Sequence, residues 1–338
     1  MRLALLALAA LCFLAPAAPS WAAGRIDEIL ERFENANAWR DHVMIVAHRG
    51  GWKENGVIRW PENSRAGVRH VIALGVEMVE LDVRLSRDGH YVVMHDSWLD
   101  RTTDCRGEVD TRTLAELRAC RLKVEGEGAV TDERVPTLAE MLELARDQVL
   151  VNVDNKLGPQ HIAGILALAH SLGVERQVVL KENIWNDARL AAMRAATADD
   201  DAASRFMPII ADDAVADPRF VERVTRAFSA HSVEMVVWRG DRTKVSIEPG
   251  PLFGGRTRAA AVRGGWHIWV NTYPIVNKPA GFLAQGRGDE LAVQAGMPAE
   301  VYGYWAEHGA TIIQTDEPKA AIEWLEQNHW RVPYALTN

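Results

Sequence analysis

The sequence is short of several features that would narrow its class. Its 338 residues contain three cysteines and no run of lysines or arginines, and its formal net charge is -8. No stretch after residue 22 approaches the roughly 18 consecutive apolar residues of a membrane span. An acidic chain without a basic run is a poor binder of nucleic acid, so we expect no nucleic-acid partner.

The chain also lacks a Ser/Pro-rich linker, a low-complexity tract and a repeat of fixed period. Its content of 48% hydrophobic and 25% charged residues is ordinary for a globular protein. The length fits either two small domains or one large barrel, so composition alone leaves the number of domains open.

The first 22 residues have a different character. Arg2 precedes the apolar run LALLALAALCFLA, and the small-x-small sequence Ser20-Trp21-Ala22 follows. This pattern predicts a signal peptide cleaved after Ala22, with an uncleaved anchor as the alternative. Leu11 before Cys12 is too large for the usual lipoprotein cleavage site. We therefore expect a periplasmic or secreted protein without a stable membrane anchor, whose net charge moves from -8 to -9 because Arg2 is lost.

Export would leave two cysteines, Cys105 and Cys120. In an oxidising compartment they could pair, closing a loop of about 15 residues that is worth roughly 3 kcal/mol in the loop-entropy model. The alternative is a pair of unpaired thiols. We expect the disulfide.

After a helical lead-in over residues 23–42, short apolar runs alternate with helix-period segments up to residue 330. The expected strands are Val43–Ala47, Val76–Asp82, Val149–Val153, Gln177–Leu180, Phe206–Ile210, Val233–Trp238, His267–Val270 and Thr311–Gln314. Between them lie segments such as SRAGVRHVIALG and TLAEMLELARD, with apolar residues spaced by three and four, as in amphipathic helices. Near-continuous apolar strands indicate a parallel sheet covered on both faces.

Eight such alternations predict an α/β fold, a single (β/α)₈ TIM barrel over residues 43–330. A doubly wound open sheet has the same local pattern and is the alternative. One irregularity follows the second strand, where VRLSRDGHYVVMHD has a turn signal at Asp88-Gly89 and no room for a helix. This segment predicts a β-hairpin extension that returns His95 and Asp96 to the neighbourhood of Glu80 and Asp82.

Polar side chains recur where the expected strands end. They are His48, Arg49, Glu80, Asp82, His95, Asp154, Lys156, Trp269, Asn271 and Asp316. In a barrel the carboxyl ends of the strands converge on one mouth, where active sites are found. Because side chains alternate along a strand, Glu80 can point inward together with Asp82, and Asp154 together with Lys156.

Three converging carboxylates repel one another unless they are protonated or bind a cation. Oxygen ligands favour Ca²⁺ or Mg²⁺ over zinc, and a cation beside Arg49 and Lys156 would hold a phosphate. His48 and His95 could then serve as general base and general acid, because imidazole titrates near neutral pH. These residue types predict metal-assisted cleavage of a phosphodiester.

The motifs together carry a resemblance to a known family. They are AHRGG, PENS, VELDVRLSRDGHYVVMHDSWLDRTT, VPTLAEML, NVDNK, IWVNT and GATIIQTDEP, in this order over residues 43–320. The chain resembles the glycerophosphodiester phosphodiesterases, within the wider phospholipase C-like phosphodiesterase barrels.

The resemblance implies a small-molecule phosphodiester substrate and release of an alcohol and sn-glycerol 3-phosphate. It implies catalytic roles for His48 and His95, metal ligands at Glu80, Asp82 and Asp154, a second-tier ligand or orienting residue at Glu62, and phosphate contacts from Arg49 and Lys156. Trp269 and Asn271 of the IWVNT motif are included among the expected substrate contacts. Whether water or the glycerol 2-hydroxyl attacks phosphorus stays open.

The chain departs from the family pattern at two places, of which the second puts substrate choice in doubt, and two further basic residues lie near the expected pocket. Asp154 stands where the family usually has glutamate, and residues 53–60 (KENGVIRW) intervene between the HRGG and PENS motifs. Lys181 and Arg239 follow the fourth and sixth strands, and they either read a second anionic group of the substrate or are solvated rim charges. The two glycines after Arg49 are expected to let the substrate approach the backbone.

Two rival functions are weighed against glycerophosphodiester hydrolysis. One is a phospholipase D-like or phosphoinositide-cleaving relative of the same barrel, which could form a cyclic phosphate. The other is a catalytically silent ligand-binding barrel, against which the intact pair of His48 and His95 argues. The alcohol group, the identity of the metal and the oligomeric state are not readable from the sequence.

Overall fold

The computed structural model describes residues 24–125, 128–197, 205–239, 248–275, 278–279 and 281–334. The expected signal peptide over residues 1–22 lies outside these ranges. Within them, none of the helices combines the length and the apolar character that crossing a bilayer requires.

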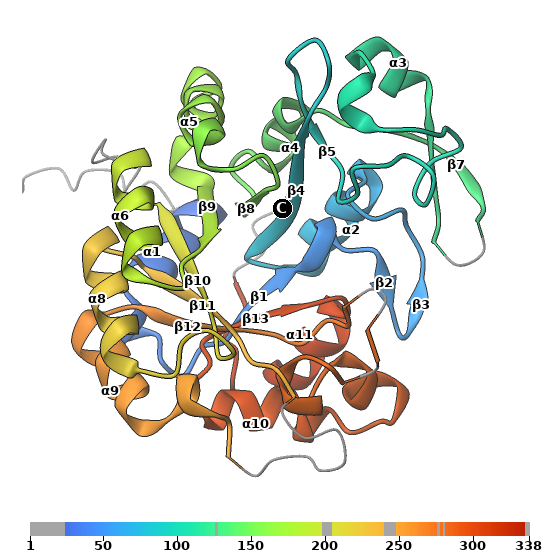
Figure 1. Cartoon of the computed structure of the whole chain (residues 1–338). Helices are drawn as coiled ribbons and strands as arrows, with labels where there is room; N and C mark the ends of the chain where they lie inside the picture. Colours follow the sequence, from blue (N-terminus) through green and yellow to red (C-terminus); the bar gives the residue numbers. More distant parts are fainter. Residues whose placement is uncertain are drawn as a thin grey trace, which may run out of the picture.

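Eight parallel strands close into a barrel surrounded by helices (Figure 1). They are β1 (Met44–Ala47), β4 (Met78–Leu85), β8 (Leu150–Asn155), β9 (Val178–Asn183), β10 (Phe206–Ala211), β11 (Ser232–Val236), β12 (His267–Asn271) and β13 (Ile312–Thr315). Closure comes from β1, which pairs with β13 on one side and with β4 on the other. The predicted (β/α)₈ barrel is confirmed, and the open-sheet alternative is wrong.

Helices follow the strands and cover their outer faces. They are α2 (Arg65–Leu74), α4 (Leu138–Ala145), α5 (Ile162–Ser171), α6 (Asp187–Ala196), α8 (Pro218–Phe228), α9 (Gly255–Gly264), α10 (Tyr302–Glu307) and α11 (Pro318–Gln327). Local sequence fixes their starts. Thr137, for example, forms a capping box with Glu140 at the start of α4, an arrangement that satisfies two otherwise unpaired backbone donors.

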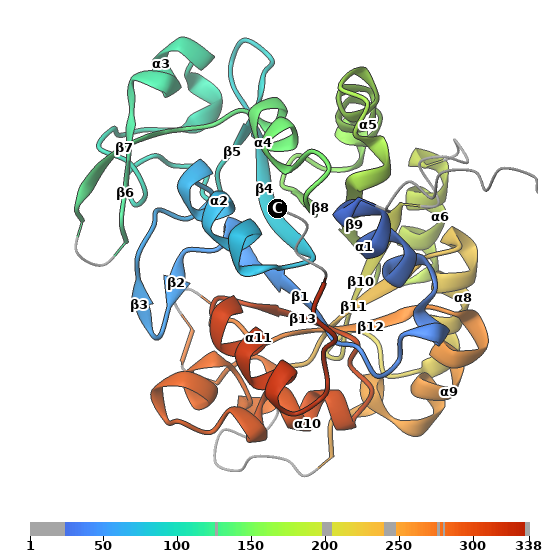
Figure 2. The same ribbon diagram turned by 180° about the vertical axis from the view of Figure 1, so that it is seen from behind.

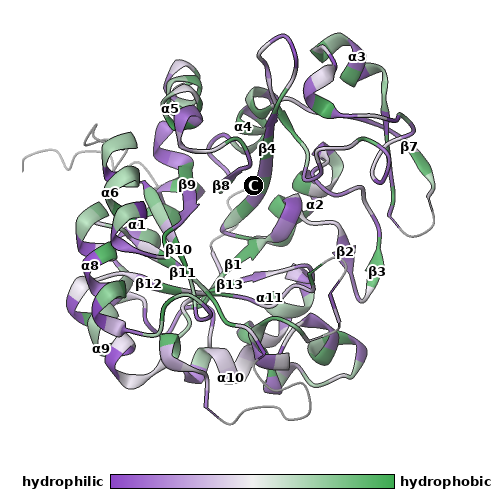
Figure 3. Ribbon diagram, viewed as in Figure 1, coloured by the Kyte–Doolittle hydropathy of each residue, from purple (hydrophilic) through white to green (hydrophobic). Residues whose placement is uncertain are grey.

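The amino-terminal end of the barrel is closed by α1 (Arg25–Glu34). Its apolar face packs against the first inward-facing side chains of the strands, which include Met44, Met78, Leu150 and Trp269. Figure 2, viewed from behind, shows α1 in front of β9 and β10, and Figure 3 shows hydrophobic colouring along strands such as β1 and β12. The core therefore fills this end of the barrel and leaves only the opposite end for chemistry.

Above this apolar layer the barrel interior becomes polar. Because inward positions recur every second residue, the next inward side chains are Glu80, Asn152, Lys181, Glu234, Asn271 and Gln314, all buried. Parallel register sets them side by side, for example Glu80 opposite Asn152 and Asp82 opposite Asp154. The sequence thus builds a polar layer directly beneath the mouth.

The predicted hairpin after the second barrel strand is present. β4 continues past the barrel to Leu85, and β5 (Tyr91–Val93) returns antiparallel to it, with Val83 opposite Val93. Gly89 has a φ of +85° at the turn, where a glycine is needed. The returning strand delivers His95 and Asp96 to the mouth.

A lobe follows the hairpin, drawn at the upper right of Figure 1. It holds α3 (Leu114–Ala119), β6 (Arg121–Lys123) and β7 (Val130–Arg134). Cys105 and Cys120 are joined by a disulfide within it, the pairing that the sequence led us to expect. The bond ties the segment after His95 to the end of α3.

The inserted residues 53–60 form a second small hairpin of β2 (Lys53–Glu54) and β3 (Val57–Ile58). Asn55 and Gly56 both have positive φ, +55° and +76°, as a type I′ turn requires. We expected only a loop here, although Asn-Gly between two short extended runs is a hairpin signal.

Candidate active site

Two histidines lie at the mouth, His48 after β1 and His95 after β5. In each ring Nδ1 lies 2.7 Å from a carboxylate oxygen, Asp316 Oδ1 for His48 and Asp96 Oδ1 for His95. A carboxylate at Nδ1 fixes the ring and its tautomer, which leaves Nε2 for proton transfer. The structure thus gives both predicted histidines the same arrangement, on different elements.

His48 is nearly enclosed, with 6% of its surface exposed. Its ring stacks on Tyr273 with 3.7 Å between the ring centroids. Asp316, its partner, also accepts hydrogen bonds from Trp52 Nε1 and Lys53 Nζ, at 2.7 and 3.0 Å. Burial lowers the pKa of His48 to about 4, although Asp316 opposes the shift. The ring is therefore a neutral base around pH 7.

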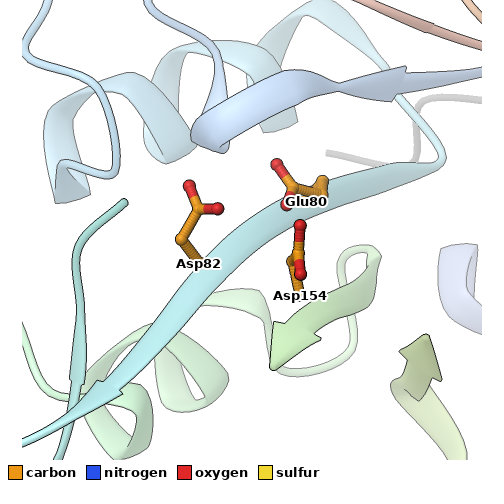
Figure 4. A group of neighbouring side chains, drawn as sticks. All are labelled: Glu80, Asp82 and Asp154. Atoms are coloured by element: carbon orange, nitrogen blue, oxygen red, sulfur yellow. The ribbon is translucent and has the colours of Figure 1, made fainter. Parts of the chain in front are cut away.

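The three predicted metal carboxylates converge. Glu80 and Asp82 project from β4 and Asp154 from the adjacent β8, and Figure 4 shows the three carboxylates turned toward one another. One oxygen of each lies within 4.8 Å of the others. Burial and the nearby Asp82 raise the pKa of Glu80 above its usual value. Two buried carboxylates and the part-exposed Asp154 repel one another, and a hard divalent cation bound by their oxygens would relieve that repulsion.

Two cations border this group on the mouth side. Lys156 Nζ lies 3.1 Å from Asp82 Oδ1 and 2.7 Å from Asp154 Oδ2, and its side chain is 25% exposed. Arg49 donates its backbone N–H to Glu80 at 3.0 Å and its Nη1 to Glu62 at 2.7 Å. The structure therefore brings both predicted phosphate contacts beside the carboxylates.

Three side chains of the PENS motif make different contacts. Glu62 binds Arg49 and Arg101 and lies outside the carboxylate group, so its geometry fits an orienting role and not that of a metal ligand. Asn63 donates Nδ2–H to Asp82 at 2.8 Å and accepts the backbone N–H of Asp82 at 3.3 Å. Ser64 caps α2 by accepting the backbone N–H of residue 67.

Arg101 is a site residue that the sequence did not predict. Its Nε and Nη2 donate to both oxygens of Asp96, at 2.6 and 3.0 Å, and it also binds Glu62. Asp96 in turn holds His95, so the guanidinium connects the histidine to the PENS motif. Tyr273 and Trp52 were missed as well, because only the closed barrel brings them against His48 and Asp316.

The glycines after Arg49 have a packing role that the sequence did not predict. Gly50 and Gly51 have φ of +73° and +80°. A Cβ on Gly51 would lie 2.2 Å from Val71 Cγ1, and one on Gly50 would lie 2.9 Å from Val68 Cγ2. Close packing of the loop on α2 therefore requires these glycines, whatever the substrate does.

The other predicted substrate contacts lie at different depths in the barrel. Lys181 is 3% exposed among carboxylates, so it is not a solvated rim charge. Trp269 belongs to the apolar layer above α1, and its Nε1 donates to Asn271, which in turn binds Glu234. Of this set only Arg239, just after β11, keeps a half-buried position at the carboxyl end.

Fold and site together define a class: a (β/α)₈ barrel with an acidic cation site, two carboxylate-held histidines and basic groups at its mouth. The model of the glycerophosphoryl diester phosphodiesterase family matches residues 48–238, more than half of the chain. The chain belongs to this family. A second model, a domain of unknown function, matches residues 206–325.

Curated relatives and solved structures agree with this assignment. The chain is similar to the glycerophosphodiester phosphodiesterase of Caldanaerobacter subterraneus subsp. tengcongensis, 40% identical over 117 residues, 34% of this chain and 46% of that one. The chain spans about half the length of the curated relatives it matches.

Two solved structures share the fold over most of the chain. A glycerophosphoryl diester phosphodiesterase from Parabacteroides distasonis has a TM-score of 0.63 at 21% identity, covering 90% of this chain and 92% of that one. An Oleispira antarctica phosphodiesterase, solved with its product sn-glycerol-3-phosphate, has a TM-score of 0.52 at 19% identity, covering 86% and 99%.

Proposed function

We propose that the protein hydrolyses a glycerophosphodiester to an alcohol and sn-glycerol 3-phosphate, with one divalent cation, Ca²⁺ or Mg²⁺. The observation that carries the proposal is the pair of histidines, each held at Nδ1 by a carboxylate, beside a group of three converging carboxylates. The family supports the reaction class, and the product bound to the Oleispira antarctica relative supports glycerol 3-phosphate as the product.

The cation would be held by Glu80, Asp82 and Asp154. When bound, it would neutralise charge on the phosphate and make phosphorus more open to attack. Asp154 already lies opposite Asp82 across the β4–β8 ladder, so the shorter side chain still reaches the group.

Arg49 and Lys156 supply the remaining positive charge for the phosphate. Arg49 is fixed by Glu62 at 2.7 Å, which orients the guanidinium before substrate arrives. Lys156 has an exposed part at the mouth, and its ammonium can turn from Asp82 toward a phosphate oxygen. Charged donors fixed in advance favour the transition state, in which negative charge spreads over the phosphate oxygens.

His48 and His95 divide the proton transfers. Neutral His48 takes the proton of the attacking group, which is either water or the glycerol 2-hydroxyl, as the new P–O bond forms. Asp316 stabilises the imidazolium that results. His95, at the more open rim with its side chain 32% exposed, donates a proton to the leaving alcohol as the old P–O bond breaks. General acid–base catalysis of this kind contributes roughly 10²- to 10⁴-fold in rate.

Phosphorus NMR of the purified protein with a panel of phosphodiesters, in Ca²⁺, Mg²⁺ or EDTA, tests the proposal. We expect glycerol 3-phosphate from a glycerophosphodiester with a divalent cation and none in EDTA. A persistent cyclic phosphate would indicate the cyclising relative instead. No turnover with any diester or cation would refute both readings.

We also propose that the protein acts in the periplasm or outside the cell. The amino-terminal pattern supports export, and the Cys105–Cys120 disulfide supports an oxidising compartment. Fractionation of cells that express the full chain, with amino-terminal sequencing of the product, checks this. We expect a mature protein that begins after Ala22, and a cytoplasmic protein of full length would contradict the proposal.

A further inference from the structure

Lys181 is a buried cation inside the barrel, beneath the carboxylates of the proposed cation site. It is 3% exposed and points inward from β9, two residues after Val179 of the apolar layer. Its Nζ lies 3.6 Å from Glu80 Oε1, 3.6 Å from Asp154 Oδ2 and 3.3 Å from Glu234 Oε2. Two of these three carboxylates are the ones expected to hold the divalent cation.

The charges around the proposed cation site determine how much positive charge its carboxylates can bind. Four carboxylates (Glu80, Asp82, Asp154 and Glu234), counted as ionised as they would be around a bound cation, face two ammonium groups (Lys156 and Lys181), which leaves two negative charges in excess. Arg49 and Glu62 are left out together, because their charges cancel in the shorter of the ion pairs that Arg49 makes, 2.7 Å to Glu62 against 4.0 Å to Asp82. One divalent cation brings this shell to neutrality. Without Lys181 the same shell would carry -3.

We propose that Lys181 is a built-in cation of the metal site, which shares Glu80 and Asp154 with the divalent ion, lowers the affinity for that ion and limits the group to one ion. The inference rests on the proposed cation site. Its physical basis is the repulsion between an ammonium and a divalent ion that use the same two carboxylates, buried Glu80 and part-exposed Asp154, in a site where charges are screened less than in water.

Glu234 holds Lys181 back from the metal carboxylates. It approaches Nζ more closely than the other two do, and its Oε1 accepts a hydrogen bond from Asn271 Nδ2 at 2.7 Å. Neutralising Glu234 would shift the ammonium toward Glu80 and Asp154. The two substitutions therefore have opposite expected effects: removal of Lys181 strengthens divalent binding, and removal of the Glu234 charge weakens it.

Calorimetric titration of the EDTA-stripped protein with Ca²⁺ or Mg²⁺ alone, without substrate, tests this. We expect Lys181→Met to bind roughly tenfold more tightly or to take up a second ion, and Glu234→Gln to bind roughly tenfold more weakly. The double variant Lys181→Met/Glu234→Gln, which leaves no unpaired buried charge at these two positions, should bind more tightly than Glu234→Gln alone. Lys319→Met, whose ammonium pairs with Glu54, is the control and should match the wild type.

Thermal unfolding of each stripped variant identifies any that fail to fold. If Lys181→Met disrupts the fold, comparison of the double variant with Glu234→Gln decides the question. Equal affinity in the wild type and Lys181→Met, or tighter binding in Glu234→Gln, would overturn the inference and leave the proposed function standing. Absence of binding in every variant would overturn the cation site itself, and the inference with it.

Discussion

Arg101 and Glu62 are joined by two parallel hydrogen bonds, Nη1 to Oε2 at 2.9 Å and Nη2 to Oε1 at 2.7 Å. Such a fork is a strong and geometrically specific form of ion pair. Through it the position of His95, held by Asp96, is tied to that of Arg49, held by Glu62. The proposed proton donor and a proposed phosphate contact are therefore oriented as one unit.

Arg101→Lys should keep the positive charge and lose the paired hydrogen bonds to Glu62. Because a lysine cannot bind both carboxylates in parallel, we expect kcat to fall roughly 10- to 100-fold, as for other groups that orient active-site residues. Steady-state kinetics on a glycerophosphodiester measures the effect. Arg118→Lys, in an exposed ion pair with Glu140, is the control. Unchanged kcat in Arg101→Lys would contradict the coupling.

The pH dependence of kcat/KM should reflect the buried state of His48. Its folded pKa is lowered to about 4, and a general base must be deprotonated, so activity is lost only as the pH falls through that lowered value. We therefore expect the acid limb of kcat/KM well below pH 6, since this parameter reports the free enzyme. An acid limb at an ordinary histidine pKa would argue against His48 as the base.

Asp316→Asn should preserve the shape of the site and remove the charge that holds His48. The ring then loses its fixed tautomer and the stabilisation of its protonated form, so kcat should fall roughly 10²- to 10⁴-fold. Near-ultraviolet circular dichroism checks the fold. A variant with full activity would show that the contact between His48 and Asp316 is only structural.

Asn63 has a left-handed backbone, with φ of +57°, and holds Asp82 through the paired contacts described above. Asn63→Ala should lower divalent-cation affinity roughly tenfold, because Asp82 loses the group that orients it. Asn55→Ala places alanine at a similar positive φ in the β2–β3 turn and controls for backbone strain. Equal losses in the two variants would assign the effect to strain.

Much of this architecture could be predicted from the sequence, because the order and spacing of the apolar runs indicate where the strands and helices begin. All eight barrel strands begin within two residues of the expected positions. The inward position of Lys181 was also readable, since it lies two residues after the inward Val179. Its burial was not predicted, because the expected strand ended at Leu180 and the observed strand continues to Asn183.

What could not be predicted are contacts between residues distant in the chain. Arg101 lies 39 residues from Glu62 and Trp52 lies 264 from Asp316, so no local pattern connects either pair. The role of Glu62 depends on these contacts. Without them its carboxylate is indistinguishable from a metal ligand.

Glu77 lies at the opposite, amino-terminal end of the barrel, where its contacts bear on stability and not on catalysis. Its buried carboxylate accepts from Arg331 at 2.9 Å and from the backbone N–H of Ile45 at 2.8 Å, and it contacts His42. Burial alone would raise its pKa, but Arg331 and His42 lower it to about 2, from the usual 4.5. A lowered folded pKa means stability that is complete above the unfolded pKa and is lost as the pH falls from 4.5 toward 2.

Glu77→Gln should reduce the free energy of unfolding by about 3 kcal/mol near pH 7, since it leaves buried positive charge unpaired. Urea unfolding between pH 3 and 7 measures the loss, and Glu326→Gln, whose part-exposed carboxylate binds the same Arg331, is the control. The difference between wild type and Glu77→Gln should shrink at low pH. A difference independent of pH would contradict the assignment.

We propose above that His48 and His95, beside a cation site, carry out acid–base hydrolysis at phosphorus. Hydrolysis of a glycerophosphodiester in ¹⁸O-labelled water, followed by phosphorus NMR, tests it most directly. The isotope shift should show one ¹⁸O on the phosphate of glycerol 3-phosphate, with the signal abolished in His48→Ala and in His95→Ala. Label found in the released alcohol, or undiminished turnover in either variant, would contradict the account.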